Sequence, residues 1–321
     1  GQGVYMWNDY NGNGIQELQE FEVAPFPDLA IYVRVFLPNQ VFVRTHQNRF
    51  SQALNFNFNQ WQNEKGLKKF ASYFYNQTSF LIERRIRRDG SNFDLNPFSK
   101  NDDELIGLNT NFRNSLFFNR GKQHHSTTYS FLINESQNLL SAGSVAAKNQ
   151  SHQLQYQHLV KKSWLFNFST STTKTASNSE NFQNRNFEIK SYQVEPKIGY
   201  LFSKNASWDI FYEYQQKENQ IGAFEILKQT RLGTSFTFNS EKGFSMNGEF
   251  SMYNNSFNGN ALSAVGFQML EGLQPGKNQT WRLLLQKNLT QYLDVNVNYQ
   301  GRNSETSKTI HTGNVQLRAF F

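Results

Sequence analysis

A short acidic segment near the start of the sequence has the residue types and spacing of a calcium-binding loop. Residues 9–20 read D-Y-N-G-N-G-I-Q-E-L-Q-E. Ca²⁺ takes six to eight oxygen ligands, and a 12-residue loop supplies them from positions 1, 3, 5, 7, 9 and 12, with glycine at the sharp turn. The residues at the six ligand positions are Asp9, Asn11, Asn13, Ile15 (through its carbonyl), Glu17 and Glu20, and Gly14 stands at the turn.

Two departures from the usual pattern indicate which kind of calcium site this is. Asn13 stands where Asp is common, which removes one negative charge, so we expect a lower affinity. Gln16 replaces the usual apolar residue of the loop, and no helical periodicity flanks it. We therefore expect a structural calcium loop rather than a paired, switching EF-hand. The alternative is a turn rich in Asn and Gly that binds no metal.

The other candidate sites are weaker. Residues 83–88 form the densest basic run, and guanidinium groups there would suit the phosphates of lipopolysaccharide; an ordinary charged rim is the alternative. His124 and His125 are adjacent, so on a strand they point to opposite faces, and the six His show no ligand spacing. There is no cysteine, and no local motif selects a nucleophile and its base, so we predict that the chain is not an enzyme. Aromatic residues are interleaved with Asn and Ser rather than gathered with Lys and Arg, which disfavours nucleic-acid binding.

The elements that carry these residues are strands with two different faces. In the last stretch, residues 308–321, Val315, Leu317 and Ala319 alternate with Gln316 and Arg318. Alternation with a period of two is typical of a strand that is apolar on one face and polar on the other. The same alternation recurs along most of the chain, for example at residues 54–59, 164–169, 208–214 and 293–300.

Repetition of this pattern predicts an all-β fold. We expect an antiparallel transmembrane β-barrel of about 14 strands (12–16) over residues 41–321, since ~10 residues suffice for a tilted strand to cross the membrane. A calcium-loop segment and connector, residues 1–40, would precede it, with an extra strand at residues 31–36. Short turns near Gly121 and at residues 161–162, 203–206 and 241–243 would face the periplasm, and long loops at 87–104, 175–184 and 254–278 would face outward. A soluble β-sandwich is the competing fold, but its strands are usually shorter.

Composition agrees with a membrane barrel. Of 321 residues only 37% are hydrophobic and mean hydropathy is −0.67, yet 16% are aromatic. No apolar run approaches the ~18 residues of a spanning helix. We expect Trp164, Trp208 and Trp281 in an aromatic girdle, and a lumen face rich in Asn, Gln, Ser and Thr. The charged residues expected on this lumen face are Asp209, Glu213, Arg282, Asp294 and Arg318. The net charge of +7 leaves open whether the surface is simply solvated or binds acidic partners.

Three segments resemble the C-terminal region of large outer-membrane proteins from Bacteroidetes-type bacteria. They are N-D-Y-N-G-N-G-I-Q-E-L-Q-E-F-E (residues 8–22), M-L-E-G-L-Q-P-G-K-N (269–278) and the terminal V-Q-L-R-A-F-F (315–321). The resemblance implies a barrel in the bacterial outer membrane that follows a larger upstream region. It implies no settled activity. Because the sequence starts at Gly1 without a signal peptide, we expect a processed form or the C-terminal part of a longer polypeptide.

These observations lead to two expectations about function. The first is a structural role, in which the barrel anchors an upstream domain or a multi-protein surface complex and calcium stiffens the junction. Its partners would be outer-membrane lipid, lipopolysaccharide and another protein or the upstream domain. The second is a water-filled transport channel, porin-like or protein-conducting, because a barrel of ~14 strands has room for water.

Overall fold

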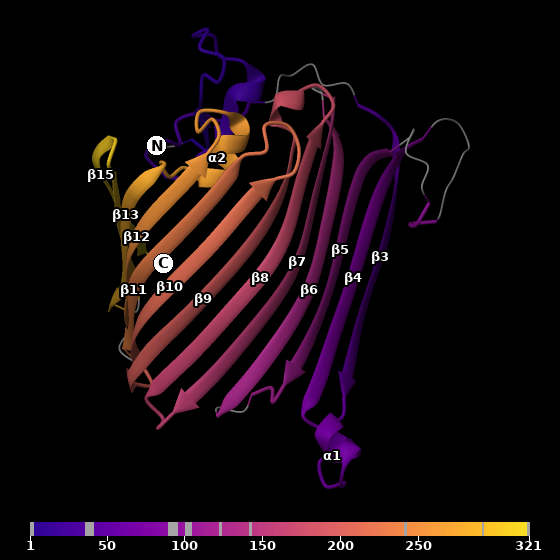
Figure 1. Ribbon diagram of the computed structural model, residues 1–321, viewed down its shortest axis with the longest axis vertical. Helices are drawn as coiled ribbons and strands as arrows, with labels where there is room; N and C mark the ends of the chain where they lie inside the picture. Colours follow the sequence, from indigo (N-terminus) through magenta and orange to yellow (C-terminus); the bar gives the residue numbers. More distant parts are fainter. Residues whose placement is uncertain are drawn as a thin grey trace.

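A single large antiparallel sheet dominates the computed structural model (Figure 1). The structure describes residues 3–35, 42–88, 96–99, 105–121, 124–140, 143–240, 243–290 and 292–319. Thirteen strands, β3 to β15, lie in the sheet in the order in which they follow in the chain, and each pairs antiparallel with its neighbours. Each strand after the first therefore returns alongside the one before it, which is the order of an up-and-down β-barrel.

The strands are between 12 and 18 residues long. Their bounds are β3 Thr45–Asn57, β4 Phe74–Arg87, β5 Leu105–Phe118, β6 His125–Leu140, β7 Gly143–Val160, β8 Trp164–Ser179, β9 Phe187–Ser203, β10 Ala206–Asn219, β11 Ile226–Ser240, β12 Phe244–Asn258, β13 Gly276–Thr290, β14 Leu293–Ser304 and β15 Ser307–Ala319.

The two faces of the sheet differ in chemistry because side chains alternate along every strand. On β10, Trp208, Ile210 and Tyr212 share one face, and each is between 44% and 47% exposed. Asp209 and Glu213 lie on the opposite face, where they form ion pairs with neighbouring strands. We call the first the apolar face and the second the inner face. Registered pairs such as Trp208 with Tyr200 and Phe236 carry the apolar face from strand to strand.

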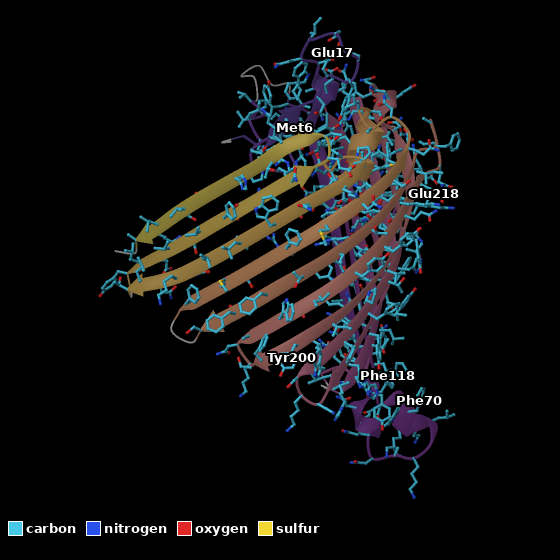
Figure 2. The ribbon with its side chains drawn as sticks, turned by 60° about the vertical axis from the view of Figure 1, so that its left-hand side comes forward. Met6, Glu17, Phe70, Phe118, Tyr200 and Glu218 are labelled. Atoms are coloured by element: carbon cyan, nitrogen blue, oxygen red, sulfur yellow. The ribbon has the colours of Figure 1, made fainter. Side chains whose placement is uncertain are left out.

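The two ends of the sheet carry different connections. The upper rim, as drawn in Figure 1, bears the N-terminal segment, helix α2 (Ala264–Leu270) and the 3₁₀ turn η3 (Gln183–Arg185). The lower rim bears mostly short turns, together with η2 (Asn59–Trp61) and α1 (Leu67–Ala71) between β3 and β4. Figure 2 shows Glu17 at the upper end, with Tyr200, Phe118 and Phe70 toward the lower end.

A second, small sheet forms in the N-terminal segment, which we define as residues 3–35. Strands β1 (Tyr5–Trp7) and β2 (Phe21–Val23) pair antiparallel, and η1 (Leu18–Glu20) directly precedes β2. The calcium-type loop is the connection between the two strands. A single bridge from Tyr5 to Tyr32 adds the end of the segment to this sheet.

The predicted fold class is confirmed. The chain is nearly all-β, its strands are antiparallel, and the 13 strands of the large sheet fall within the predicted 12–16. Among the described residues, β3 pairs only with β4 and β15 only with β14, so these strands do not close the ring. The described part of the chain contains no helix long and apolar enough to cross a membrane.

Several predicted boundaries differ from the structure. Residues 175–179, predicted as part of a loop, continue β8, because all five pair in register with β7 and residues 175–177 also pair with β9. Residues 31–36 were expected as a strand but form only the bridge at Tyr32, and Phe36 lies outside the described residues. The predicted domain boundary at residues 40 and 41 also lies outside them. Trp164 is the first residue of β8, whereas Trp281 lies within β13.

The close packing of Phe211 against the inner face gives a test of the fold. A Cβ atom on Gly233 would lie 2.2 Å from Phe211 Cζ, whereas one on Gly313 would meet nothing within 4 Å. We expect Gly233→Ala to lower the free energy of unfolding by about 1–3 kcal/mol, the usual cost of overpacking. Gly313→Ala is the matched control and should be nearly neutral. Equal denaturant midpoints for the two variants would contradict this packing.

Candidate functional site

The calcium-type loop is folded so that its side-chain oxygens point into it. Asp9 Oδ1 accepts hydrogen bonds from the backbone N–H groups of Gly12 (2.7 Å) and Asn13 (3.1 Å), and Asp9 Oδ2 accepts from Gly14 (2.8 Å). Asn11 and Asn13 accept in the same way from backbone groups two residues later. Gly12 and Gly14 both have φ of 72°, which L side chains rarely adopt. The two glycines thus let the backbone turn around the side-chain oxygens of Asp9, Asn11 and Asn13.

Glu20, at the last position of the loop, supplies the strongest sign that a cation fits. Its side chain is only 1% exposed. Oε2 accepts a hydrogen bond from Trp7 Nε1 (2.8 Å), but Oε1 is buried and has no hydrogen-bond partner among the described residues. A buried carboxylate oxygen without a partner is costly unless a positive charge satisfies it. The donor set, carboxylates with amide and backbone oxygens, suits Ca²⁺.

Carboxylates alone do not make a metal cluster here. The described residues contain no group of three or more His, Cys, Asp or Glu side chains placed to hold a metal ion. Asp9, Glu17 and Glu20 are therefore not gathered around one point by themselves. A cation at this loop would depend on Asn11, Asn13 and the Ile15 carbonyl to complete its ligands.

Arg185, in η3, joins the N-terminal segment to the loop between β8 and β9. Its Nη1 donates to the backbone oxygen of Gln19 (2.5 Å) and its Nη2 donates to Glu22 Oε2 (2.7 Å). Glu22 is itself buried and also accepts from the Tyr10 hydroxyl (3.1 Å). Burial raises the pKa of Tyr10 well above its usual range, so the phenol stays protonated and keeps this hydrogen bond. The loop and η3 are thus linked through one connected set of polar groups.

Arg302, on β14, holds the other end of the segment. Nη1 and Nη2 donate to the two carboxylate oxygens of Asp28, at 2.5 and 2.7 Å, which is a bidentate pair. The guanidinium also lies over the ring of Phe26, 4.1 Å from its centroid. The hydrogen bonds from Arg302 hold the pKa of Asp28 below its usual value.

Helix α2 closes part of the upper rim from the inside. Ser263 caps its N-terminus by accepting from Gly266 N–H (3.0 Å). Its buried face, Val265, Met269 and Leu270, packs on Ile189 and Leu227 of the sheet. Lys217 donates to the Met269 carbonyl at the end of the helix (3.0 Å) and pairs with Glu271. Gly272, next in the chain, has φ of 78° and leaves no room for a Cβ beside Pro25.

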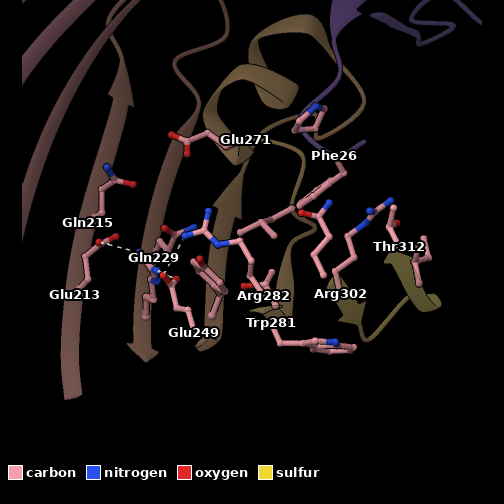
Figure 3. Close-up of a pocket in the computed structure, with 18 of the residues that line it drawn as sticks. Phe26, Glu213, Gln215, Gln229, Glu249, Glu271, Trp281, Arg282, Arg302 and Thr312 are labelled. Carbon is pink, nitrogen blue, oxygen red and sulfur yellow. Dashed lines mark hydrogen bonds and ion pairs between the residues drawn. The ribbon is translucent and has the colours of Figure 1, made fainter. Parts of the chain in front are cut away.

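Charged side chains form a row across the inner face, below α2 (Figure 3). Arg231 lies between Glu213 (3.6 Å) and Glu249 (2.6 Å), and Glu249 also reaches Arg282 (3.7 Å). Arg231 stacks on Phe211, 4.7 Å from the ring centroid. Because neighbouring strands carry opposite charges in this row, most of the charge is compensated within the wall.

A cavity of about 570 Å³ lies between this wall and the N-terminal segment. Pro25 and Phe26 line it from the segment, and Glu213, Arg231 and Arg282 line it from the sheet. Its other lining side chains include several glutamines and threonines. Such a lining can hold water or polar ligands, and it places the segment over the inner face of the sheet.

The sequence-predicted residues are only partly brought together. The six residues of the calcium prediction, Asp9, Asn11, Asn13, Ile15, Glu17 and Glu20, lie in the connection between β1 and β2. Glu213 and Arg282 line the cavity, Asp209 pairs with Lys197, and Asp294 lies opposite Arg318 in the register of β14 and β15. Sequence reasoning missed Arg185, Arg302 and Asp28, which fix the segment to the sheet. No local sequence pattern distinguishes Arg185. Arg302 lies at one of the alternating polar positions of β14, which is only a weak signal that it faces the interior.

The basic run at residues 83–88 does not form one surface. Residues 83–87 lie at the upper end of β4, where alternation separates them onto two faces. Arg84 is 3% exposed, and Arg85 pairs with Glu83 (3.1 Å). Binding of lipopolysaccharide at this run stays a prediction.

His125, one of the two adjacent histidines, lies 2.8 Å from the side chain of Asn119, and its ring stacks with the ring of His158.

Comparison with known proteins gives little further information. No model of a known protein family matches the sequence, and no curated protein matches it. Among solved structures, the β domain of the Bordetella autotransporter BrkA matches 77% of this chain and 92% of its own, with 7% identity and a TM-score of 0.32. The transport unit of the autotransporter AIDA-I from Escherichia coli matches 89% and 93%, with 9% identity and a TM-score of 0.31. Both TM-scores are below 0.5, so neither similarity bears on what this chain does.

The bidentate pair between Asp28 and Arg302 gives a test of the docked segment. We expect Asp28→Asn to weaken docking of the segment by about 1 kcal/mol. This is the contribution of a charge-assisted hydrogen bond, lowered because the pair is partly exposed to solvent. Hydrogen exchange of the backbone amides of residues 3–35 at pH 7 should then speed up roughly fivefold. Glu305→Gln is the control, since the pair of Glu305 with Lys277 is far more exposed, and it should leave exchange unchanged. Equal exchange in both variants would contradict the role of Arg302.

The same pair predicts a pH dependence. Because the pKa of Asp28 is lowered on docking, its stabilisation is complete above its ordinary value of 3.8 and is lost as pH falls through the lower value of the docked state. We expect exchange in residues 3–35, corrected for intrinsic rates, to accelerate as pH falls below about 4 in the parent chain. The acceleration should be smaller in Asp28→Asn, and an equal acceleration in the two proteins would contradict the assignment.

Proposed function

We propose that this chain is a β-barrel of the bacterial outer membrane that anchors another protein unit at the cell surface. The observation that supports a membrane location is the apolar face of the sheet. Large apolar side chains remain exposed on it across neighbouring strands, and a soluble protein rarely leaves such a continuous surface uncovered. Examples from β8 to β12 are Trp164, Phe166, Phe168, Tyr192, Ile198, Trp208, Ile210, Tyr212, Leu232, Phe250 and Met252.

The strand lengths and the inner face support the same proposal. A tilted strand crosses a bilayer with ~9–11 residues, and every strand of the large sheet exceeds that length. The ion pairs of the inner face would be costly against lipid but are acceptable in a lumen. The resemblance of three sequence segments to Bacteroidetes-type outer-membrane proteins is a further reason for proposing this location.

An anchoring role is favoured because the N-terminal segment lies over the inner face. Arg185 and Arg302 fix it at two separate points of the upper rim. Pro25 and Phe26 occupy one side of the cavity, and α2 packs on the sheet beside them. The segment also exposes apolar side chains, Ile31, Val33 and Val35, each more than 60% exposed. A rim that is covered and apolar suits attachment of a protein better than free diffusion of solutes.

Calcium has a structural part in this proposal. The ion would be bound by Asp9, Asn11, Asn13, Ile15, Glu17 and Glu20, and it would neutralise the buried Glu20 oxygen that has no partner among the described residues. Arg185 contacts the backbone carbonyl of Gln19, which lies within this loop, and the side chain of Glu22, which lies two residues after the loop ends. Ordering the loop would therefore also order the contacts between the segment and the rim.

The alternative is a transport channel, which the polar cavity and the charged row of the inner face favour. Conductance of the full polypeptide in a planar bilayer separates the two roles. We expect insertion without steady current, because the segment and α2 cover the lumen. Large, stable, ohmic steps from protein shown to be folded and inserted would contradict the anchoring role and support a channel.

The calcium proposal predicts a gain in stability that depends on the loop. At calcium 100-fold above its dissociation constant, binding should add about 2.7 kcal/mol to the stability of the loop. We expect this gain in the parent chain and its loss in Glu20→Gln, whereas Glu64→Gln, at a carboxylate outside the loop, should keep it. The measurement is the difference in thermal unfolding between calcium and a chelator, with titration calorimetry as a second readout.

Comparing that difference, rather than absolute stability, is necessary because Glu20 also accepts a hydrogen bond from Trp7. Equal loss of stability for Glu20→Gln in calcium and in chelator, together with no heat of binding to the parent chain, would contradict a calcium site.

A further inference from the structure

The two edge strands of the large sheet have the chemistry of interior strands but only one neighbour each. β3 and β15 are 13 residues long, sufficient to cross a bilayer. Phe50, Leu54 and Phe56 of β3 lie on the apolar face, and Val315 and Leu317 of β15 lie on the same face at the other end of the sheet. Nearly every residue of both strands is exposed, in contrast to β11 in the middle of the sheet.

Open edges of this kind are not stable in a membrane. Lipid offers no hydrogen bonds, so a strand that faces it with unpaired N–H and C=O groups is strongly disfavoured. If the apolar face contacts lipid, as proposed above, something must pair with the outer edges of β3 and β15. Figure 1 shows these strands at opposite ends of the sheet.

The direction of the strands restricts what can close the gap. Thirteen strands alternate in direction, so β3 and β15 both run from the upper rim to the lower rim. Direct pairing of the two would be parallel, whereas single-chain barrels of bacteria are antiparallel with an even number of strands. A second copy inserted in the same direction would also place β3 beside β15 in parallel. Only an odd number of added strands, running from the lower rim to the upper, pairs antiparallel with both edges.

The described residues hold no stretch for that strand. Residues 3–35 form the docked segment, and all thirteen long strands are already in the sheet. The longest internal stretch outside the described residues is 89–95, shorter than the ~9 residues a crossing needs.

We propose that the ring is completed by an odd number of strands, one at the least, from polypeptide that is covalently continuous with residues 1–321. Such a strand begins at the lower rim, where β15 ends, and finishes at the upper rim. Gly3 is at that rim, because its N–H donates to Ala30 (2.9 Å), two residues from the Asp28 that binds Arg302 of β14. β14 is the direct neighbour of β15. The added strand has apolar side chains facing lipid and polar ones facing the lumen, and it makes 14 or another even number of strands.

Photo-crosslinking in the membrane tests this proposal. A benzoylphenylalanine is placed at Asn314 of β15 or Ala53 of β3, both on the inner face and away from lipid, in the full polypeptide in its native membrane. Thr237, on the inner face of β11, is the matched control, since both of its neighbours are known. We expect crosslinks from both edge sites, within one polypeptide, to residues outside 1–321, and only β10 or β12 peptides from Thr237.

Each other product overturns the proposal. A crosslink between β15 and β3 means direct parallel closure, a dimer means pairing between copies, and a separate protein means that the strand is not covalently joined. Absence of any protein crosslink at the edges, with Thr237 labelled, means that they are open. The inference rests on the membrane location, so the same sample is fractionated first: absence from the outer membrane would instead contradict the proposed function.

Discussion

Strict alternation of side chains between the two faces of each strand is the constraint on which the rest of the structure depends. A strand that is shifted by one residue would move its apolar side chains into the polar interior. Pairs such as Trp208 with Phe236, and Glu213 with Arg231, show that the register keeps like faces together. The ion pairs are then placed on the inner face, and the large aromatic side chains are left on the other.

The N-terminal segment and α2 use the inner face as their docking surface. Polar strands alone would not hold them, so contact is made through a few strong groups: Arg302 with Asp28, Arg185 with Glu22, and Lys217 at the end of α2. The M-L-E-G-L-Q-P-G-K-N segment acquires a structural meaning here. Met269 and Leu270 pack on the sheet, Gly272 makes room for Pro25, and the side chain of Asn278 bonds both backbone groups of Gln274. The calcium-type loop is thereby connected to the sheet through contacts far apart in sequence.

The strand class, the polarity of the faces and the approximate number of strands could be predicted because they depend on local alternation. The extent of β8 could not, since Thr175 and Ser177 look like loop residues and become strand only by pairing with β7 and β9. The helical connection between β3 and β4 was missed because α1 has five residues, too few for a visible period. Arg185 and Asp28 are single residues whose partners are 163 and 274 positions away, and no spacing rule relates them.

The central claim is that the apolar face contacts lipid, and quenching of tryptophan fluorescence by brominated phospholipids tests it directly. Single-tryptophan variants are compared in reconstituted vesicles. Trp208 and Trp281 lie on the apolar face, whereas Trp7 hydrogen-bonds Glu20 in the N-terminal segment. We predict strong quenching of Trp208 and Trp281 and little quenching of Trp7. Equal, weak quenching of all three in folded protein would contradict a membrane-spanning sheet.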